Sequence, residues 1–138
     1  MDASVVAKWA LPDEEYIEKA LKVKQDHILG RINLSAPTIL PLEIANAIWK
    51  AVKLKRLSQA DTQQALKLLQ DISIELYSLD WVEVSEVLDI ANRFDVAVYD
   101  VAYIFLSEKL KAPFISSDTK LVEKVKGHFQ IIPLKEYV

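Results

Sequence analysis

The chain has 138 residues, 51% of them hydrophobic and 27% charged, with a formal net charge of −3 at pH 7. This length fits one domain spanning residues 1–138, and the apolar content predicts a well-filled core and excludes intrinsic disorder. Two glycines and no cysteine exclude phosphate-binding glycine loops, disulfides and thiolate metal sites, and the acidic balance excludes a hold on nucleic acid through bulk positive charge.

Helical and extended segments alternate along the chain. Ile17, Ala20, Leu21 and Ile28 recur at helical spacing and predict a helix over residues 13–29, with Gly30 as its C-cap. The later elements are expected to be a strand at 33–37, a helix at 40–57, a helix capped by Ser58 with Asp61, a strand at 72–77, a helix to residue 94 capped by Asp80 with Glu83, a helix at 99–110, a strand at 113–116, a helix at 118–125 and a strand at 130–133. This alternation predicts an α/β domain whose mostly parallel central sheet is covered by helices on both faces.

Carboxylates lie beside hydrophobic segments at four positions, Asp2, Glu43, Asp100 and Asp118. Acidic residues are rarely buried without a partner. Asp2 and Asp118 follow the ends of strand candidates, whereas Asp100 and Glu43 belong to predicted helices. Because ligands of open parallel sheets bind beyond the carboxyl ends of the strands, we predict that these acids meet in one cleft and share a divalent cation.

Each acid also has an ordinary structural explanation. Asp118 taken alone is best explained as an N-cap, and Asp100 would interact favourably with a helix dipole. Glu43 fits an exposed helix position, and Asp2 fits a frayed terminus. The conjunction of the four acids, rather than any single one, favours a functional site.

Four blocks of the sequence point to one known family. They read Asp-Ala-Ser-Val-Val-Ala-Lys-Trp, Pro-Leu-Glu-Ile-Ala-Asn-Ala-Ile-Trp, Val-Ala-Val-Tyr-Asp-Val-Ala-Tyr-Ile-Phe-Leu-Ser-Glu and Phe-Ile-Ser-Ser-Asp-Thr-Lys-Leu. In order and spacing they resemble PIN-domain proteins, in particular the VapC-type toxins of prokaryotic toxin–antitoxin pairs. The resemblance implies a three-layer, Rossmann-like α/β/α sandwich and a metal-dependent endoribonuclease that acts on RNA. It also implies a homodimer that a cognate VapB-type antitoxin keeps inactive.

The resemblance also implies roles for individual residues. The acidic set of the family falls on Asp2, Glu43, Asp100 and Asp118, the hydroxyl two residues before the last acid falls on Ser116, and frequent neighbours of the site fall on Ser4 and Asn46. In the family, several apolar residues of a first strand precede the first acid, whereas only Met1 precedes it here. We therefore expect that the first strand is truncated and that the natural protein begins upstream of Met1.

Oxygen ligands without His or Cys favour Mg²⁺ or Mn²⁺ over zinc. We expect Asp2 and either Asp100 or Asp118 to bind the ion directly, with Glu43 acting partly through water. The ion would lower the pKa of a bound water, so that hydroxide can attack phosphorus. The pattern leaves open whether one or two ions bind. Ser116 is expected to orient a water or a carboxylate and is not assigned as a nucleophile.

Basic and aromatic residues supply weaker hypotheses about partners. Lys50, Lys53 and Arg56 are candidates to position substrate phosphates, although an ordinary solvated helix face explains them equally well. Trp9 or Trp49 would line an apolar groove for an antitoxin helix, or else belong to the core. No apolar run reaches the length of a membrane span and no basic leader precedes an apolar segment, so we expect a cytoplasmic protein.

Three other functional classes fit the residues less well. The isolated His27 and His128 are expected at the surface, which argues against a Ser/His/Asp hydrolase or a histidine-pair ribonuclease. A catalytically silent binding or regulatory module of the same fold is the main alternative, and the retention of all four acids argues against it. A phosphohydrolase of small phosphate esters ranks last, because the chain lacks an Asp-x-Asp pair.

Overall fold

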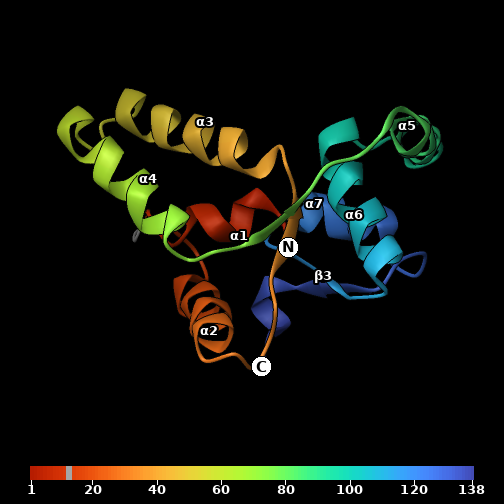
Figure 1. Cartoon of the computed structure of the whole chain (residues 1–138), viewed down its shortest axis with the longest axis horizontal. Coiled ribbons are helices and arrows are strands. Elements are labelled where there is room, and N and C mark those ends of the chain that lie inside the picture. The colour runs from red at the N-terminus through yellow and green to blue at the C-terminus, as the bar shows by residue number, and fades with distance from the viewer. Residues whose placement is uncertain (12–13) are drawn as a thin grey trace.

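The apolar periodicity of the chain forms helices, and the short apolar runs between them form strands (Figure 1). A computed structural model describes residues 1–11 and 14–138. In chain order, the elements are α1 (Ala3–Ala7), α2 (Ile17–Ile28), β1 (Ser35–Pro37), α3 (Leu40–Lys53), η1 (Gln59–Asp61), α4 (Thr62–Gln70), β2 (Glu75–Tyr77), α5 (Trp81–Phe94), α6 (Val98–Leu110), β3 (Phe114–Ser116), α7 (Thr119–Val125), β4 (Ile131–Pro133) and η2 (Leu134–Glu136). The predicted combination of helices with parallel strands is confirmed.

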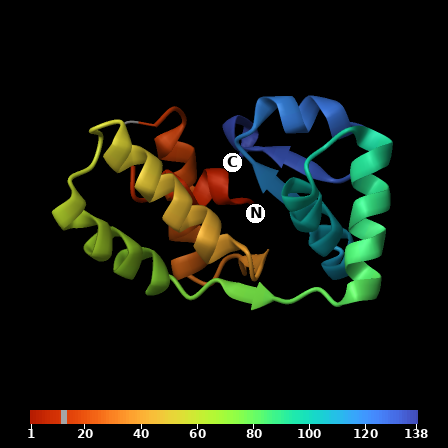
Figure 2. The same ribbon diagram turned by 90° about the horizontal axis from the view of Figure 1, so that it is seen from above.

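The strands form two parallel pairs, β1 with β2 and β3 with β4. The sequence predicted a single central sheet, so the division into two pairs differs from that prediction. Figure 2 shows α1 to α4 on one side, α5 to α7 with β3 on the other, and the N-terminus between them. Met1 and Asp2 form no strand of their own, but the backbone N–H of Asp2 donates to the carbonyl of Ile115 in β3 at 3.1 Å.

The structure confirms the helix caps predicted at Gly30 and Asp80 and contradicts the cap predicted at Ser58. Gly30 follows α2 with a φ of 70°, the left-handed conformation expected of a C-terminal glycine. Asp80 forms the predicted capping box at the start of α5. The predicted cap at Ser58 is wrong, because its hydroxyl donates to Asp61 Oδ2 at 2.5 Å and α4 begins only at Thr62. The predicted helix start at Asp13 lies outside the described residues.

One hydrophobic core joins the two strand pairs. Its fully buried members include Val5, Val23, Leu40, Ile104 and Phe114, which come from both sides of the molecule. A second, smaller cluster lies between α5 and α6. Within residues 1–11 and 14–138, no helix has both the length and the apolarity needed to cross a bilayer.

His27 is not a surface residue, in contrast to the prediction. Its side chain is half-buried at the end of α2, with Nδ1 3.2 Å from the carbonyl oxygen of Ile32 and Nε2 3.0 Å from that of Ile72. The ring therefore joins the segments that lead into β1 and β2. These contacts are distant in sequence, so periodicity could not reveal them.

Candidate acidic site

Asp2 is the buried centre of the predicted site. Only 5% of the residue is exposed, and its backbone is fixed by the bond to Ile115 at the edge of β3. Its Oδ1 caps α1 by accepting the N–H of Val5 at 3.3 Å, and Oδ1 also accepts the hydroxyl of Ser4. The hydroxyl of Ser116, at the carboxyl end of β3, donates to Oδ2. Asp2 is therefore held on both oxygens and is not a frayed terminal residue.

Serine hydroxyls connect Asp2 with the segment that carries the last acid. Ser116 donates to Asp2 and accepts the backbone N–H of Asp118 at 3.0 Å. The oxygen of Ser4 accepts the N–H of Ser117 at 3.2 Å and the hydroxyl of Ser117 at 2.7 Å. The turn after β3 and the start of α1 are thus fastened to each other through side chains.

Asp118 caps α7, as its position taken alone predicted. Its Oδ1 accepts the backbone N–H groups of Lys120 at 2.9 Å and Leu121 at 3.0 Å. The residue is exposed, in contrast to Asp2. A helix cap and a functional carboxylate are compatible here, because the cap fixes the side chain beside the turn that holds Asp2.

Glu43 and Asp100 lie in the first turns of α3 and α6, and Tyr103 connects these two helices. The hydroxyl of Tyr103, one turn after Asp100, donates to Glu43 Oε2. The Tyr103 ring is buried and stacks on Phe114 of β3, with 6.3 Å between the ring centroids. This packing fixes the position of the phenol against the half-buried carboxylate.

The charges of neighbouring carboxylates act on Asp100 and Glu43. Burial raises the pKa of Asp100, and the charges of Asp2 and Asp118 raise that pKa further. Burial also raises the pKa of Glu43, where the bond from Tyr103 opposes the rise and the charges of Asp100 and Asp2 add to it. Asp2 and Asp118 are therefore near enough to Asp100, and Asp2 and Asp100 near enough to Glu43, for their charges to act on it.

Burial dominates at the innermost groups. It raises the pKa of Asp2, against the lowering effect of the hydrogen bonds from Ser116 and Ser4. It lowers the pKa of the Met1 ammonium to about 6, although the charge of Asp2 acts in the opposite direction. The pKa of Tyr103 is far above its ordinary value because of burial and the bond to Glu43, so the phenol is a hydrogen-bond donor at any physiological pH.

Comparison with known proteins places this arrangement in a family. A model of the PIN domain matches residues 1–127. The chain belongs to the PIN-domain family. Ribonuclease VapC3 of Pyrobaculum aerophilum is 29% identical over 125 residues, which are 90% of this chain and 92% of that protein. Exonuclease VapC9 of the same organism is 28% identical over 90 residues, or 64% of this chain and 65% of that protein.

A solved structure shows the same fold. The crystal structure of PAE2754 from Pyrobaculum aerophilum matches with a TM-score of 0.66 and 24% identity, covering 97% of this chain and 88% of that one. At this identity the likeness concerns the fold. It agrees with the expected α/β PIN architecture of helices around parallel strands.

The donor set of this PIN domain has the chemistry that a hard divalent cation requires. Asp2, Glu43, Asp100 and Asp118 supply carboxylate oxygens, and the charges of neighbouring acids raise the pKa of Glu43 and of Asp100; an ion among them would relieve that repulsion. However, across residues 1–11 and 14–138, no three Asp, Glu or His side chains are arranged so that they could hold a metal ion together. The acids thus share a region without forming a ready ligand shell.

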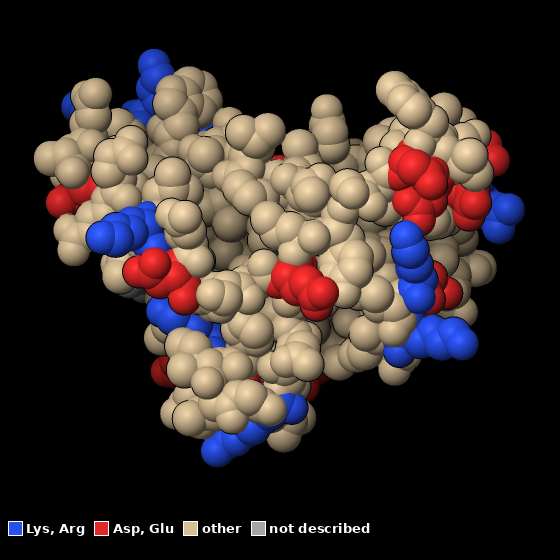
Figure 3. Space-filling model, viewed as in Figure 1, with Lys and Arg blue, Asp and Glu red and all other residues tan. Residues whose placement is uncertain are grey.

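Among the basic residues proposed for substrate phosphates, Lys53 and Arg56 each contact another side chain in the structure. Lys53 follows Glu43 by ten residues along α3, or about 15 Å, and its Nζ lies over the Trp49 ring at 5.6 Å from the centroid. Arg56 donates to Glu14 at 2.5 Å. On the face shown in Figure 3, Lys and Arg side chains form separate groups rather than one basic surface. Asn46 is exposed one turn after Glu43, and Lys50 one turn further.

Two site residues escaped the sequence analysis. Tyr103 follows Asp100 at a spacing of three, which places both on one side of α6, and this spacing is the signal that could have identified it. Ser117 adjoins Ser116 in the turn after β3. Its bond to Ser4 joins residues that are 113 positions apart, so no local pattern indicates it.

Proposed function

We propose that this PIN-domain protein is a metal-dependent endoribonuclease that hydrolyses RNA phosphodiester bonds, as the toxin of a type II toxin–antitoxin pair. The observation that carries the proposal is the grouping of four carboxylates, remote in sequence, around the buried and doubly hydrogen-bonded Asp2. The similarity to Ribonuclease VapC3 over 90% of the chain supports the choice of RNA as the substrate.

Asp2, Glu43, Asp100 and Asp118 are the residues that would hold Mg²⁺ or Mn²⁺. When bound, such an ion supplies a coordinated water of lowered pKa and neutralises charge on the scissile phosphate. Ser4 and Ser116 hold the Asp2 carboxylate in one orientation. Tyr103 occupies one oxygen of Glu43 and thereby fixes the direction in which the other points.

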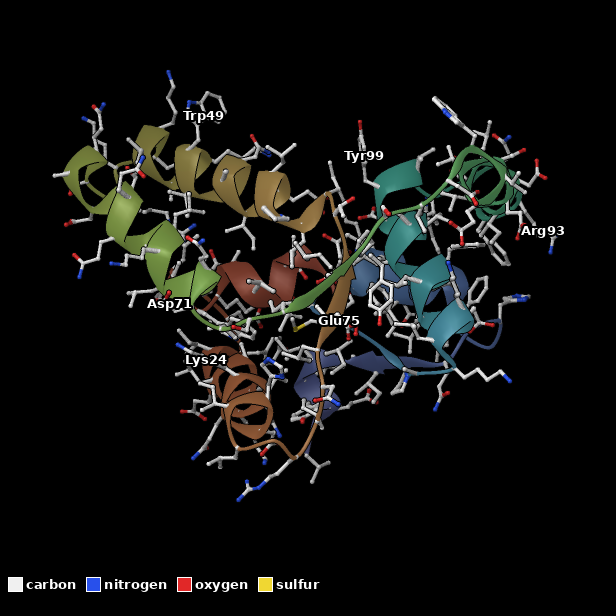
Figure 4. All side chains as sticks on the ribbon, in the orientation of Figure 1. Lys24, Trp49, Asp71, Glu75, Arg93 and Tyr99 are labelled. Atoms are coloured by element: carbon white, nitrogen blue, oxygen red, sulfur yellow. The ribbon has the colours of Figure 1, made fainter. Side chains whose placement is uncertain are left out.

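Exposed aromatic residues support the proposed protein partners, a VapB-type antitoxin and a second copy of the chain. Trp49 is 56% exposed and Tyr99 62% exposed, and they project from α3 and α6 on the same side of the molecule (Figure 4). Trp and Tyr are enriched among the residues that contribute most to protein–protein binding. We propose a cytoplasmic protein, in keeping with these soluble partners.

Cleavage of RNA tests the catalytic part of the proposal. The wild-type chain should cleave generic single-stranded RNA internally with Mn²⁺ or Mg²⁺ and lose this activity in EDTA. Asp100→Asn should lower the rate by at least about 100-fold, in the range typical of a lost charge-stabilising group. Asp89→Asn, on the exposed side of α5, is the matched control and should cleave like the wild type. Equal activity of both variants would contradict the assignment of the site.

The second candidate function is a catalytically silent binding module. The observation in its favour is that no three acids among the described residues form a ligand set. Thermal unfolding with increasing Mn²⁺ separates the two candidates. A nuclease should gain about 3 kcal/mol of stability at 100 times the dissociation constant, and Asp100→Asn should gain less. A module should show no metal-dependent gain and no RNA cleavage.

A further inference from the structure

A cavity of about 200 Å³ adjoins the acidic site at the turn after β3. It is lined by α7, β4 and η2, and by Tyr16, the residue that precedes α2. Ser116 and Ser117 line it as well, and their hydroxyls donate to Asp2 and to Ser4 respectively. The cavity, which we call the α7 cavity, therefore shares a wall with the acidic site.

The lining of the α7 cavity combines apolar and polar side chains. Val122 and Leu134 contribute buried apolar surface. Thr119, Glu123 and Lys126 are exposed residues of the lining, and their spacing of four and then three places them along one side of α7. An occupant therefore meets apolar surface together with donors and acceptors of hydrogen bonds.

Tyr16 has a backbone conformation that is unusual at the start of a helix. Its φ of 57° and ψ of 29° are left-handed, whereas the residue before a helix is ordinarily extended. Such conformations are strained in a bulky residue and gather at functional sites. A bond to Glu15 raises the pKa of the Tyr16 hydroxyl, and the residue is 41% exposed where it lines the cavity. The neutral aromatic ring is thus accessible to an occupant.

The size and charge of the α7 cavity restrict the class of ligand. Its volume is below the range of about 300–1,000 Å³ found for drug-sized ligands, so it suits one small group. Two lysines and two glutamates line it, namely Lys126, Lys135, Glu123 and Glu136. This balance of charge favours a neutral group over a phosphate. An unpaired nucleobase is neutral and planar, stacks on aromatic side chains and forms hydrogen bonds along its edges.

We propose that the α7 cavity binds one unpaired nucleobase of an RNA strand, stacked on the Tyr16 ring, while a nearby phosphate of the same strand lies at the acidic site. This inference rests on the proposed nuclease function. Ser116 and Ser117 connect the cavity to Asp2 and Ser4 through fixed hydrogen bonds, so the base held in the cavity determines which phosphodiester bond reaches the acids.

Binding of RNA in EDTA tests the proposal apart from cleavage. Fluorescence anisotropy with labelled single-stranded oligonucleotides of each of the four bases identifies the tightest ligand. Tyr16→Ala should weaken its binding at least about fivefold, the lower end of what one base stacked on an aromatic ring contributes. Tyr16→Phe keeps the ring and should bind like the wild type. Trp81→Ala is the matched control, because it removes an 89% exposed aromatic side chain from α5, and it should also bind like the wild type.

Cleavage in Mn²⁺ supplies a second measurement. Stacking on Tyr16 acts equally on bound substrate and transition state, so Tyr16→Ala should raise KM at least about fivefold and leave kcat nearly unchanged. The preference for a base beside the cut should weaken in the same variant. An effect on kcat alone would overturn the base site, although the enzyme would remain a nuclease.

Nuclear magnetic resonance of the wild-type protein gives a measurement that needs no variant. Adding the tightest oligonucleotide in EDTA should shift the backbone amide signals of residues 116–119 and 126–131, and leave those of residues 81–94 in place. Unchanged signals at the cavity would overturn the proposal, as would equal affinities of Tyr16→Ala and Trp81→Ala. If the wild type cleaves no RNA in Mn²⁺, the nuclease function fails, whereas these binding measurements still decide whether the cavity holds a base.

Discussion

At the scale of single residues, Ser116 is the group on which the geometry of the acidic site depends most. Its hydroxyl donates to the Asp2 carboxylate and accepts the N–H of Asp118, so one fully buried side chain connects two acids. A lost partner leaves a buried carboxylate underbonded, and charged groups lose the most in this way.

Ser116→Ala should therefore lower the free energy of unfolding by about 1.5–3 kcal/mol. Urea denaturation monitored by circular dichroism measures the change. Ser85→Ala, at an exposed position of α5, is the control and should remain within about 0.5 kcal/mol of the wild type. Similar losses in both variants would show that the hydroxyl of Ser116 has no special role.

Asp100→Asn should stabilise the protein at neutral pH. Burial and the charges of Asp2 and Asp118 raise the pKa of Asp100 in the folded state. Ionisation of this acid therefore opposes folding, an effect that is absent below its ordinary pKa of about 4 and complete above the raised value. In the absence of divalent cations, we expect a gain of about 0.5–2 kcal/mol at pH 7 that disappears near pH 3.

Chemical denaturation of Asp100→Asn and of the Asp89→Asn control across this pH range provides the measurement. The control should follow the wild type at every pH. If Asp100→Asn is less stable than the wild type at pH 7, negative charge is not clustered around Asp100.

At the scale of secondary structure, two similar capping patterns behave differently. Asp80 and Glu83 exchange bonds of 2.9 Å with each other's backbone N–H groups at the start of α5. At Ser58 the residue three positions on is Asp61, whose side chain is one carbon shorter than that of glutamate. It accepts the Ser58 hydroxyl instead of reaching back to the backbone, and a 3₁₀ turn separates Ser58 from α4.

Removal of the two side chains should accordingly have unequal effects. Asp80→Ala loses a formed cap and should lower the stability by about 1 kcal/mol. Ser58→Ala, at an exposed position, should lower it by less than about 0.5 kcal/mol. Thermal and urea unfolding of the two variants measure their losses of stability. Equal losses would mean that the capping box of Asp80 does not stabilise α5 more than the Ser58 side chain stabilises its own turn.

At the scale of the whole molecule, Asp26 joins α2 to the end of the chain. Its carboxylate accepts bonds from Lys22 at 3.0 Å, Arg31 at 2.9 Å and the Tyr137 hydroxyl at 3.0 Å. These bonds, led by that from Lys22, lower the pKa of Asp26 to about 2. The carboxylate is buried, so the ionised form stabilises the junction between two distant parts of the sequence.

The junction should weaken in acid. Because the folded pKa of Asp26 is below its ordinary value of about 4, its contribution is complete above that value and is lost as the pH falls through about 2. Tyr137→Phe, which removes one of the three bonds, should lower the Tm at pH 7 by about 4 °C.

In Asp26→Asn, the loss of stability between pH 4 and pH 2 should be smaller than in the wild type. An unchanged dependence of stability on pH in this range would disprove the role of the Asp26 carboxylate.

Local pattern predicted the elements whose signal is local. The helices expected at 40–57, 80–94 and 99–110 correspond to α3, α5 and α6, because their apolar stripes and caps are complete within each segment. α1 was missed, since five residues are too few to display a periodicity. The acids were identified from their unusual neighbours and from the family resemblance, and these signals lie within short blocks of sequence.

The sequence by itself determined the α/β class and the membership of the PIN-domain family, and it supplied the four acids proposed for the site, since each of these depends on residue type and local spacing. Only the tertiary structure showed that Tyr103 bonds to Glu43, that Ser117 bonds to Ser4 and that the strands form two parallel pairs. The physical reason is that hydrogen bonds and burial depend on distances between atoms of remote segments, and those distances exist only once the chain has folded.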